Sequence, residues 1–160
     1  MNFLALFLLI QGLGLAEPIP SILWGTWTVK KIVPTRTIFC WDDKEAKALL
    51  GTQLQYSAKE FRWRRTALQD PVAEVTTVTA EQFHDENSGR GALSSQVTFE
   101  QLGIREPQAL QVKIAHPDAN ITAGTTEIPG DVLLVKSQNT IIFAVCGIYF
   151  EATRSGIRRK

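Results

Sequence analysis

The sequence has few of the residues on which catalysis and metal binding usually depend. Its 160 residues include two cysteines, two histidines and one methionine. It contains no G-x-S-x-G motif, no H-E-x-x-H motif and no glycine pattern that would cradle a phosphate. An enzymatic role therefore has no motif to support it, and the sequence indicates no cofactor.

An excess of charge of either sign is also missing. The chain carries 17 basic and 16 acidic residues, for a net charge of +1. This balance argues against an extended basic surface for nucleic acid. Basic residues gather only at Arg62, Arg64 and Arg65 and in the tail at 155–160. Since Arg62, Trp63 and Arg64 alternate, we expect Trp63 to face inward and both arginines to face outward; a stripe that grips an anionic partner is the alternative.

No hydrophobic run is long enough to cross a membrane. The longest extends from Phe3 to Ile10, whereas a membrane-spanning helix needs roughly 20 apolar residues. Small residues at Gly14 and Ala16 fit a signal-peptidase site, although no lysine or arginine precedes the run. We expect residues 1–16 to be a cleaved signal peptide. Residues 17–160 would then form a single secreted or periplasmic domain without a membrane anchor.

Both cysteines lie in the part of the chain that would be exported. Cys40 and Cys146 are 146 − 40 = 106 residues apart. In an oxidising compartment we expect them to form a disulfide bond, which would close a loop of nearly the whole domain. Two free buried thiols are the alternative.

Short runs typical of β-strands dominate the sequence, and helical signals are confined to two places. Asp42 begins a short helical pattern that ends at Gly51, and residues 79–82 match a capping box. The strand-like runs are 22–33, 52–58, 61–64, 72–79, 96–102, 110–114, 131–136 and 140–153. These patterns predict an all-β fold, namely a small antiparallel β-barrel of seven to nine strands with one or two short helices; a β-sandwich is the alternative.

The segment Trp24-Gly25-Thr26-Trp27 resembles the G-x-W signature of the lipocalins and related calycin barrels. In that family the tryptophan packs across the closed end of the barrel and a basic residue after the last strand covers it. The resemblance assigns these roles to Trp27 and Arg154, which would plug the base of the barrel. The chain departs from the family in having no T-D-Y element and in its cysteine pairing.

Aromatic residues are plentiful on the strand-like runs. We expect Trp41, Tyr56, Phe61, Trp63 and Phe99 to line an apolar cavity; the alternative is that they are core and plug residues. Alanines that would leave space for a ligand occur at positions 58, 73, 109, 115 and 144. The leading hypothesis is a secreted β-barrel that binds a small apolar or amphipathic molecule in its interior.

A second hypothesis places the function on the surface. The protein would be an exported inhibitor or interaction module that binds an extracellular protein. The longest polar connections, from Phe83 to Leu93 and from Pro117 to Gly130, would carry that role.

Two histidines are the remaining candidates for site chemistry. His84 and His116 stand near carboxylates and are weak candidates for a metal or acid–base site, because their spacing matches no ligand motif. Asn120 begins a formal N-glycosylation sequon, which has meaning only in a eukaryotic secretory pathway.

Overall fold

A computed structural model describes residues 17–35, 40–88, 96–115 and 128–156 of the chain. The predicted signal peptide, His116, the Asn120 sequon and the end of the basic tail lie outside the described residues. So do residues 89–93, the second part of the first long connection, and residues 117–127, most of the second.

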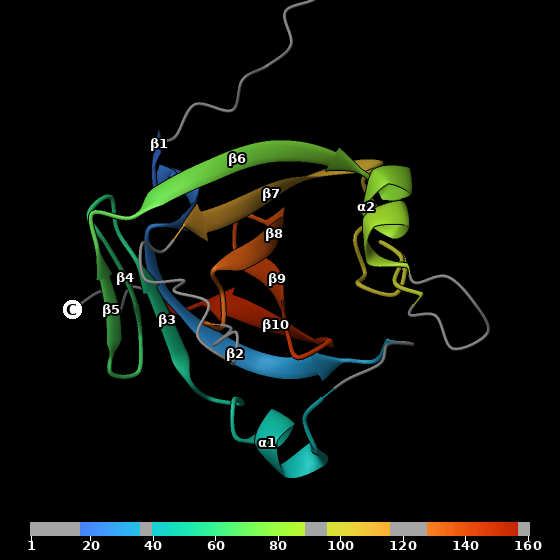
Figure 1. The fold of residues 1–160 in the computed structure, drawn as a ribbon, viewed down its shortest axis with the longest axis horizontal. Coiled ribbons are helices and arrows are strands. Elements are labelled where there is room, and N and C mark those ends of the chain that lie inside the picture. The colour runs from blue at the N-terminus through green and yellow to red at the C-terminus, as the bar shows by residue number, and fades with distance from the viewer. Residues whose placement is uncertain (1–16, 36–39, 89–95, 116–127, 157–160) are drawn as a thin grey trace, which may run out of the picture.

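The described residues form one antiparallel sheet with two short α-helices, so the all-β class is confirmed (Figure 1). The helices are α1 (Asp43–Lys47) and α2 (Ala80–Asn87), and a single 3-10 turn, η1, covers Ser21–Leu23. The strands are β1 (Glu17–Pro18), β2 (Gly25–Val33), β3 (Gln53–Tyr56), β4 (Glu60–Trp63), β5 (Thr66–Gln69), β6 (Val72–Thr79), β7 (Gln108–Ala115), β8 (Val132–Ser137), β9 (Thr140–Val145) and β10 (Ile148–Arg154).

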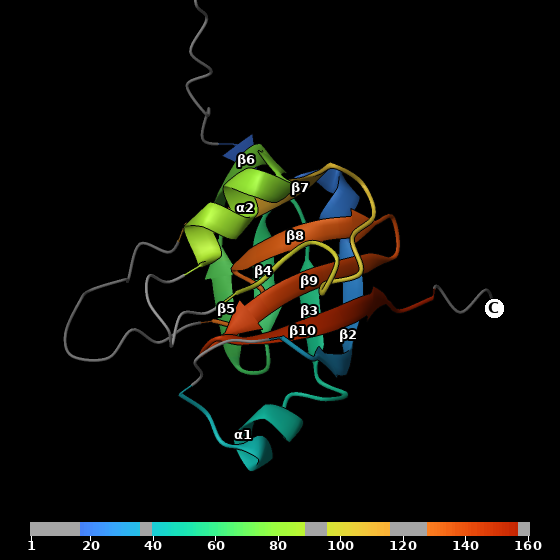
Figure 2. The same ribbon diagram turned by 90° about the vertical axis from the view of Figure 1, so that its right-hand side faces the viewer.

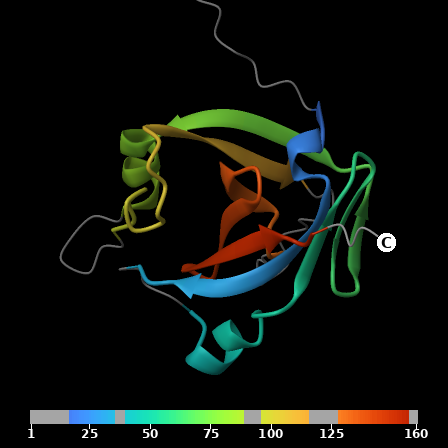
Figure 3. The ribbon, with the colours of Figure 1, turned by 180° about the vertical axis from the view of Figure 1, so that it is seen from behind.

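Most strands pair with their neighbours in sequence, and the strand near the end of the chain pairs with one near its beginning. Their order in the sheet is β1-β6-β7-β8-β9-β10-β2-β3-β4-β5, so the last strand pairs with the first long one. The sheet curls until β6 and β7 lie across from β2, and β5 and β1 form its two edges (Figures 1 and 3). The result is a half-barrel that is not closed between β5 and β6 within the described residues.

The structure has ten strands, more than the predicted seven to nine, because some short strands have no recognisable pattern in the sequence. β1 and β5 were not predicted, and the predicted run 140–153 is two strands. Cys146 and Gly147 divide that run, with φ angles of 53° and 76°, as a two-residue hairpin turn requires.

The strand predicted at 96–102 is wrong. This segment contains turns and no strand beyond a single bridge residue. Thr98 and Gln101 explain the difference, because each donates its backbone N–H to the other's side-chain oxygen, at 3.0 and 3.2 Å. The same reciprocal pattern caps both helices, through Asp42 with Glu45 and Thr79 with Gln82.

Both faces of the sheet are buried where β8, β9 and β10 lie side by side (Figure 2). Successive side chains on a strand point to opposite faces. Leu133 and Phe150 accordingly pack in one cluster, and their neighbours Leu134 and Tyr149 pack in another.

The first group, here called the inner cluster, fills the concave side of the sheet, because it draws side chains from both ends of the strand order. Its largest fully buried members are Trp27, Phe61, Phe143 and Phe150. The second group, the outer cluster, lies on the convex side under α2 and the turns at 96–104. Its members are Val33, Val78, Phe83, Val97, Phe99, Leu102, Ile104, Ala109, Leu134, Ile142 and Tyr149.

Candidate functional site

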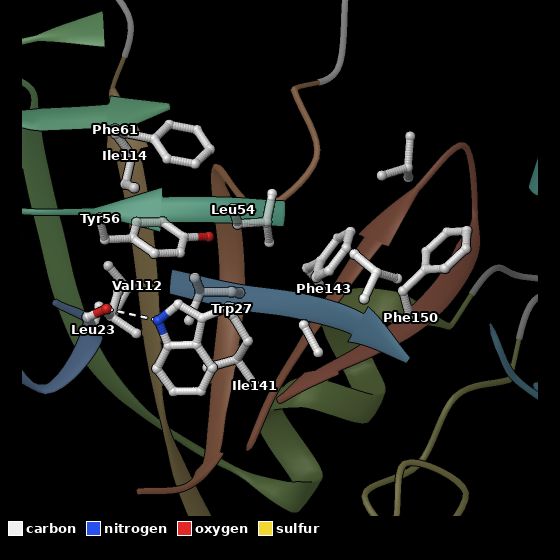
Figure 4. Close-up of a cluster of buried hydrophobic side chains, with 14 of the residues drawn as sticks. Leu23, Trp27, Leu54, Tyr56, Phe61, Val112, Ile114, Ile141, Phe143 and Phe150 are labelled. Carbon is white, nitrogen blue, oxygen red and sulfur yellow. Dashed lines mark hydrogen bonds between the residues drawn. The ribbon is translucent and has the colours of Figure 1, made fainter. Parts of the chain in front are cut away.

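Trp27 and Arg154 meet at the start of β2. The Trp27 side chain is completely buried, and its indole N–H donates a 2.7 Å hydrogen bond to the Leu23 carbonyl (Figure 4). The Arg154 guanidinium lies over the ring, with Cζ 4.2 Å from its centroid. It also donates to the carbonyls of Ile22, Trp24 and Gln138. Arg154 thus ties the last strand to the segment that precedes the first long strand.

Two of the predicted ligand-binding aromatics are deep in the inner cluster. Tyr56 and Phe61 stack with their ring centroids 4.8 Å apart, and each side chain is at most 3% exposed. The Tyr56 hydroxyl donates to the Gly130 carbonyl at 2.8 Å. Burial, with a further contribution from the charge of Asp131, raises the pKa of Tyr56 well above its usual value. Both rings therefore act as core in this structure.

The other three predicted aromatics are not gathered with them. Trp41 and Trp63 are partly exposed and pack against the edge of the inner cluster. The Trp63 indole N–H is buried and has no hydrogen-bond partner among the described residues. Phe99 belongs to the outer cluster, where it packs against Phe83 at 5.3 Å between ring centroids. The structure therefore separates Phe99 from the concave side.

A small apolar pocket opens on the convex side of the sheet, beside α2. We call it the α2 pocket; it has a volume of about 80 Å³. Phe83 of α2 forms one wall, and Val132 and Leu134 of β8 contribute to another. Ala144 of β9 pairs with Tyr149 of β10, and its short side chain leaves room between bulkier neighbours.

Polar groups gather beside this pocket. The Tyr149 hydroxyl donates to the Asn87 side-chain oxygen at 3.2 Å, and the Asn87 amide donates to the Phe83 carbonyl at 2.8 Å. Burial raises the pKa of Tyr149 to about 12, so its hydroxyl remains a proton donor at neutral pH. Ser88, next in the chain, has a buried hydroxyl without a partner among the described residues, and it is not one of the residues that line the pocket. The pocket thus joins an apolar body to a polar end, which is the usual composition of a small-molecule site.

Sequence reasoning missed most of this pocket. Ala144 is one of the alanines predicted to leave space for a ligand, but nothing in the sequence indicates that it lies beside α2. Asn87 and Tyr149 are 62 residues apart, and only the paired strands bring them together. The segment from Phe83 onward was expected to act through its polar loop. In the described part it contributes a buried phenylalanine and an amide instead.

The histidine candidates do not form a site in the described residues. The His84 side chain is 44% exposed and lies 3.4 Å from an Asp85 carboxylate oxygen. In the part of the chain that is described, no three His, Cys, Asp or Glu side chains gather as metal ligands. His116 lies outside the described residues, so its relation to His84 is untested.

The predicted disulfide is confirmed. Cys40 and Cys146 are bonded, with Cα atoms 5.3 Å apart, and the Cys40 N–H donates to the Cys146 carbonyl. The bond joins the hairpin turn between β9 and β10 to the chain just before α1. Among the described helices, none has the length and apolar composition to cross a bilayer.

Comparison with known proteins finds no matching family model, no matching curated protein and no matching solved structure.

Proposed function

We propose that this protein binds a small apolar or amphipathic molecule and that the α2 pocket receives the apolar end of that molecule. The observation that carries the proposal is the meeting of an apolar hollow with two polar side chains that line it, Asn87 and Tyr149. Export of the protein belongs to the same proposal, and it is supported by the signal-like residues 1–16 and by the disulfide bond.

The pocket's dimensions limit the ligand. A hollow of about 80 Å³ accommodates a short alkyl end or a small ring, and the remainder of the ligand would lie toward the polar groups. Each buried methylene contributes roughly 0.8 kcal/mol of transfer free energy. Asn87 and the Tyr149 hydroxyl, which both line the pocket, can offer hydrogen bonds to a polar head group.

We place the ligand beside α2 because the concave side is occupied by the protein's own rings. Tyr56 and Phe61 stack there, and Phe143 stacks on Phe150 at 5.6 Å between centroids. A lipocalin-like plug of Trp27 and Arg154 is part of the proposal as a structural device, with binding assigned elsewhere.

An amide NMR titration with hexanol tests the proposal. We expect saturable shifts at residues 83–87, 144 and 149. Ala144→Leu would fill the pocket and weaken binding by about ten-fold or more, because packed side chains leave no space for the ligand. Ala67→Leu is the matched control; Ala67 is exposed on β5, and this variant should bind hexanol as the parent protein does.

Two results would contradict this assignment. Saturable shifts confined to Trp41 and Trp63 would move the site to the concave side. Equal binding of hexanol by the parent protein and Ala144→Leu would show that the ligand does not bind in the α2 pocket.

A further inference from the structure

A second hollow region lies on the outer surface of β2, β3 and β4, away from the α2 pocket. One hollow, of about 450 Å³, is lined by Trp24, Gln53 and Arg154 among others. Its neighbour, of about 290 Å³, is lined by Gln53, Gln55, Arg62 and Arg64 together with Thr52. Gln53 lines both hollows, so they are neighbours on this surface, and together they are here called the arginine groove.

The charges in the arginine groove are of one sign. Three arginines and no acidic residue line it in the described part of the chain. Glu60 balances Arg62 through two hydrogen bonds of 2.9 and 3.0 Å. Arg64 and Arg154 form no ion pair with any described residue.

Arg64 and Arg154 are nevertheless held in place. Arg64 lies over the Trp63 ring, with Cζ 4.8 Å from the centroid, and donates to the Ala48 carbonyl at 3.0 Å. Arg154 is fixed over Trp27 by its three carbonyl partners. Both guanidinium groups keep N–H donors beyond these contacts, because each has five. Positioned arginines with spare donors are suited to bind carboxylates.

Trp24 adds an apolar contact at one end of the arginine groove. Its side chain is 46% exposed, yet its indole N–H donates to the Ile19 carbonyl at 2.8 Å, which fixes the ring. Exposed tryptophan and arginine are the residue types that contribute most to protein–protein binding. Between Trp24 and Arg64, the amides of Gln53 and Gln55 offer hydrogen bonds to a peptide backbone.

We propose that the arginine groove binds an acidic, extended segment of a protein partner. Carboxylates of the segment pair with Arg64 and Arg154, and an apolar side chain of the segment packs on Trp24. Charge complementarity selects this occupant, since two guanidinium groups lack a carboxylate partner among the described residues. This inference is independent of the α2 pocket, which shares no lining residue with the groove.

Fluorescence anisotropy with a labelled peptide of alternating glutamate and leucine tests the proposal. The peptide should bind the full chain, and binding should weaken as salt rises. Arg64→Gln should weaken it about ten-fold, the scale of one charge-assisted hydrogen-bonded pair. Arg105→Gln is the matched control, because Arg105 is exposed and lies outside the groove. Trp24→Ala should also weaken binding.

Circular dichroism of each variant separates a loss of binding from a loss of folding. Equal weakening by Arg64→Gln and Arg105→Gln would overturn the proposal, because only net charge would then matter. Stronger binding of a heparin-derived oligosaccharide than of the peptide would overturn the choice of partner. Undetectable peptide binding to the parent protein would overturn the site.

Discussion

Trp27 is one of the largest fully buried side chains of the sheet and stands near the start of β2. Its indole is completely buried, hydrogen-bonded to Leu23 and covered by Arg154. Trp24, three residues earlier, has the same side chain but is 46% exposed. The two positions separate the effect of burial from the effect of residue type.

Trp27→Ala should therefore lower the free energy of unfolding by about 3–5 kcal/mol, through lost burial and the cavity left behind. Urea unfolding followed by circular dichroism measures the change. Trp24→Ala should cost about 1 kcal/mol or less, since half of its surface is already hydrated. Equal effects of the two substitutions would argue against Trp27 as the buried closure of the base.

Gly130 is a second position where a single added carbon atom should affect stability. Its φ angle is 84°, and a Cβ there would collide with the Tyr56 hydroxyl and a Leu54 methyl group. Gly130→Ala should lower the free energy of unfolding by about 2–5 kcal/mol, from backbone strain and overpacking together. Gly156→Ala is the control, because nothing lies within 4 Å of its added methyl group. A neutral Gly130→Ala in thermal unfolding would contradict the contact with Tyr56.

At the scale of elements, α2 connects the sheet to the candidate site. Phe83 and Asn87, one turn apart on this helix, form part of the α2 pocket. The helix begins at a capping box in which Thr79 and Gln82 exchange hydrogen bonds of 3.0 and 3.1 Å. The position of the helix start thus affects the geometry of the pocket.

Thr79→Ala should lower the free energy of unfolding by about 1 kcal/mol, because the Gln82 N–H loses its acceptor. Amide hydrogen exchange in α2 should speed up in parallel. Thr79→Ser keeps the oxygen and should restore both quantities to near the parent values. Unchanged exchange in Thr79→Ala would show that the sheet, rather than the cap, holds α2.

Local chemistry explains which elements could be predicted from the sequence. The helix start at Asp42 and the capping box at Thr79 were predicted because all their partners lie within three residues. The alternation of Arg62 and Trp63 on β4 likewise indicated the correct faces, whereas Arg64 lies beyond the end of that strand, in a turn with a positive φ angle. Residues 96–102 were predicted as a strand because the apolar residues Val97, Phe99 and Leu102 are spaced as in a strand. These side chains are buried, but the hydrogen bonds between Thr98 and Gln101 turn the chain.

At the scale of the whole molecule, only part of the architecture could be predicted from the sequence. The strand-rich composition indicated the antiparallel strands and the expected export indicated the disulfide, whereas Arg154, the last residue of β10, was singled out only by the resemblance to lipocalins. The second buried face was not predictable, since it depends on which side of β8 to β10 receives α2 and residues 96–104. The contact of Asn87 with Tyr149 likewise needs the curvature of the sheet.

The disulfide should contribute strongly to the stability of the whole chain. It links residues 106 positions apart, and the chain-entropy model gives about 4–5 kcal/mol for a loop of that length. Urea unfolding with and without reductant should show a difference of about 4 kcal/mol. The double variant Cys40→Ala, Cys146→Ala should be insensitive to reductant. Identical unfolding curves for the parent protein in both conditions would contradict this contribution.

The proposed function requires that the protein carries a small ligand beside α2. Native mass spectrometry of the protein purified from its producing cells tests the claim most directly, with Ala144→Leu and Ala67→Leu measured in parallel. We expect extra mass on the parent protein and on Ala67→Leu that disappears on denaturation, and no extra mass on Ala144→Leu. The same extra mass on all three proteins would contradict the assignment of the ligand to the α2 pocket, and no extra mass on any of them would contradict the claim that the protein carries a ligand.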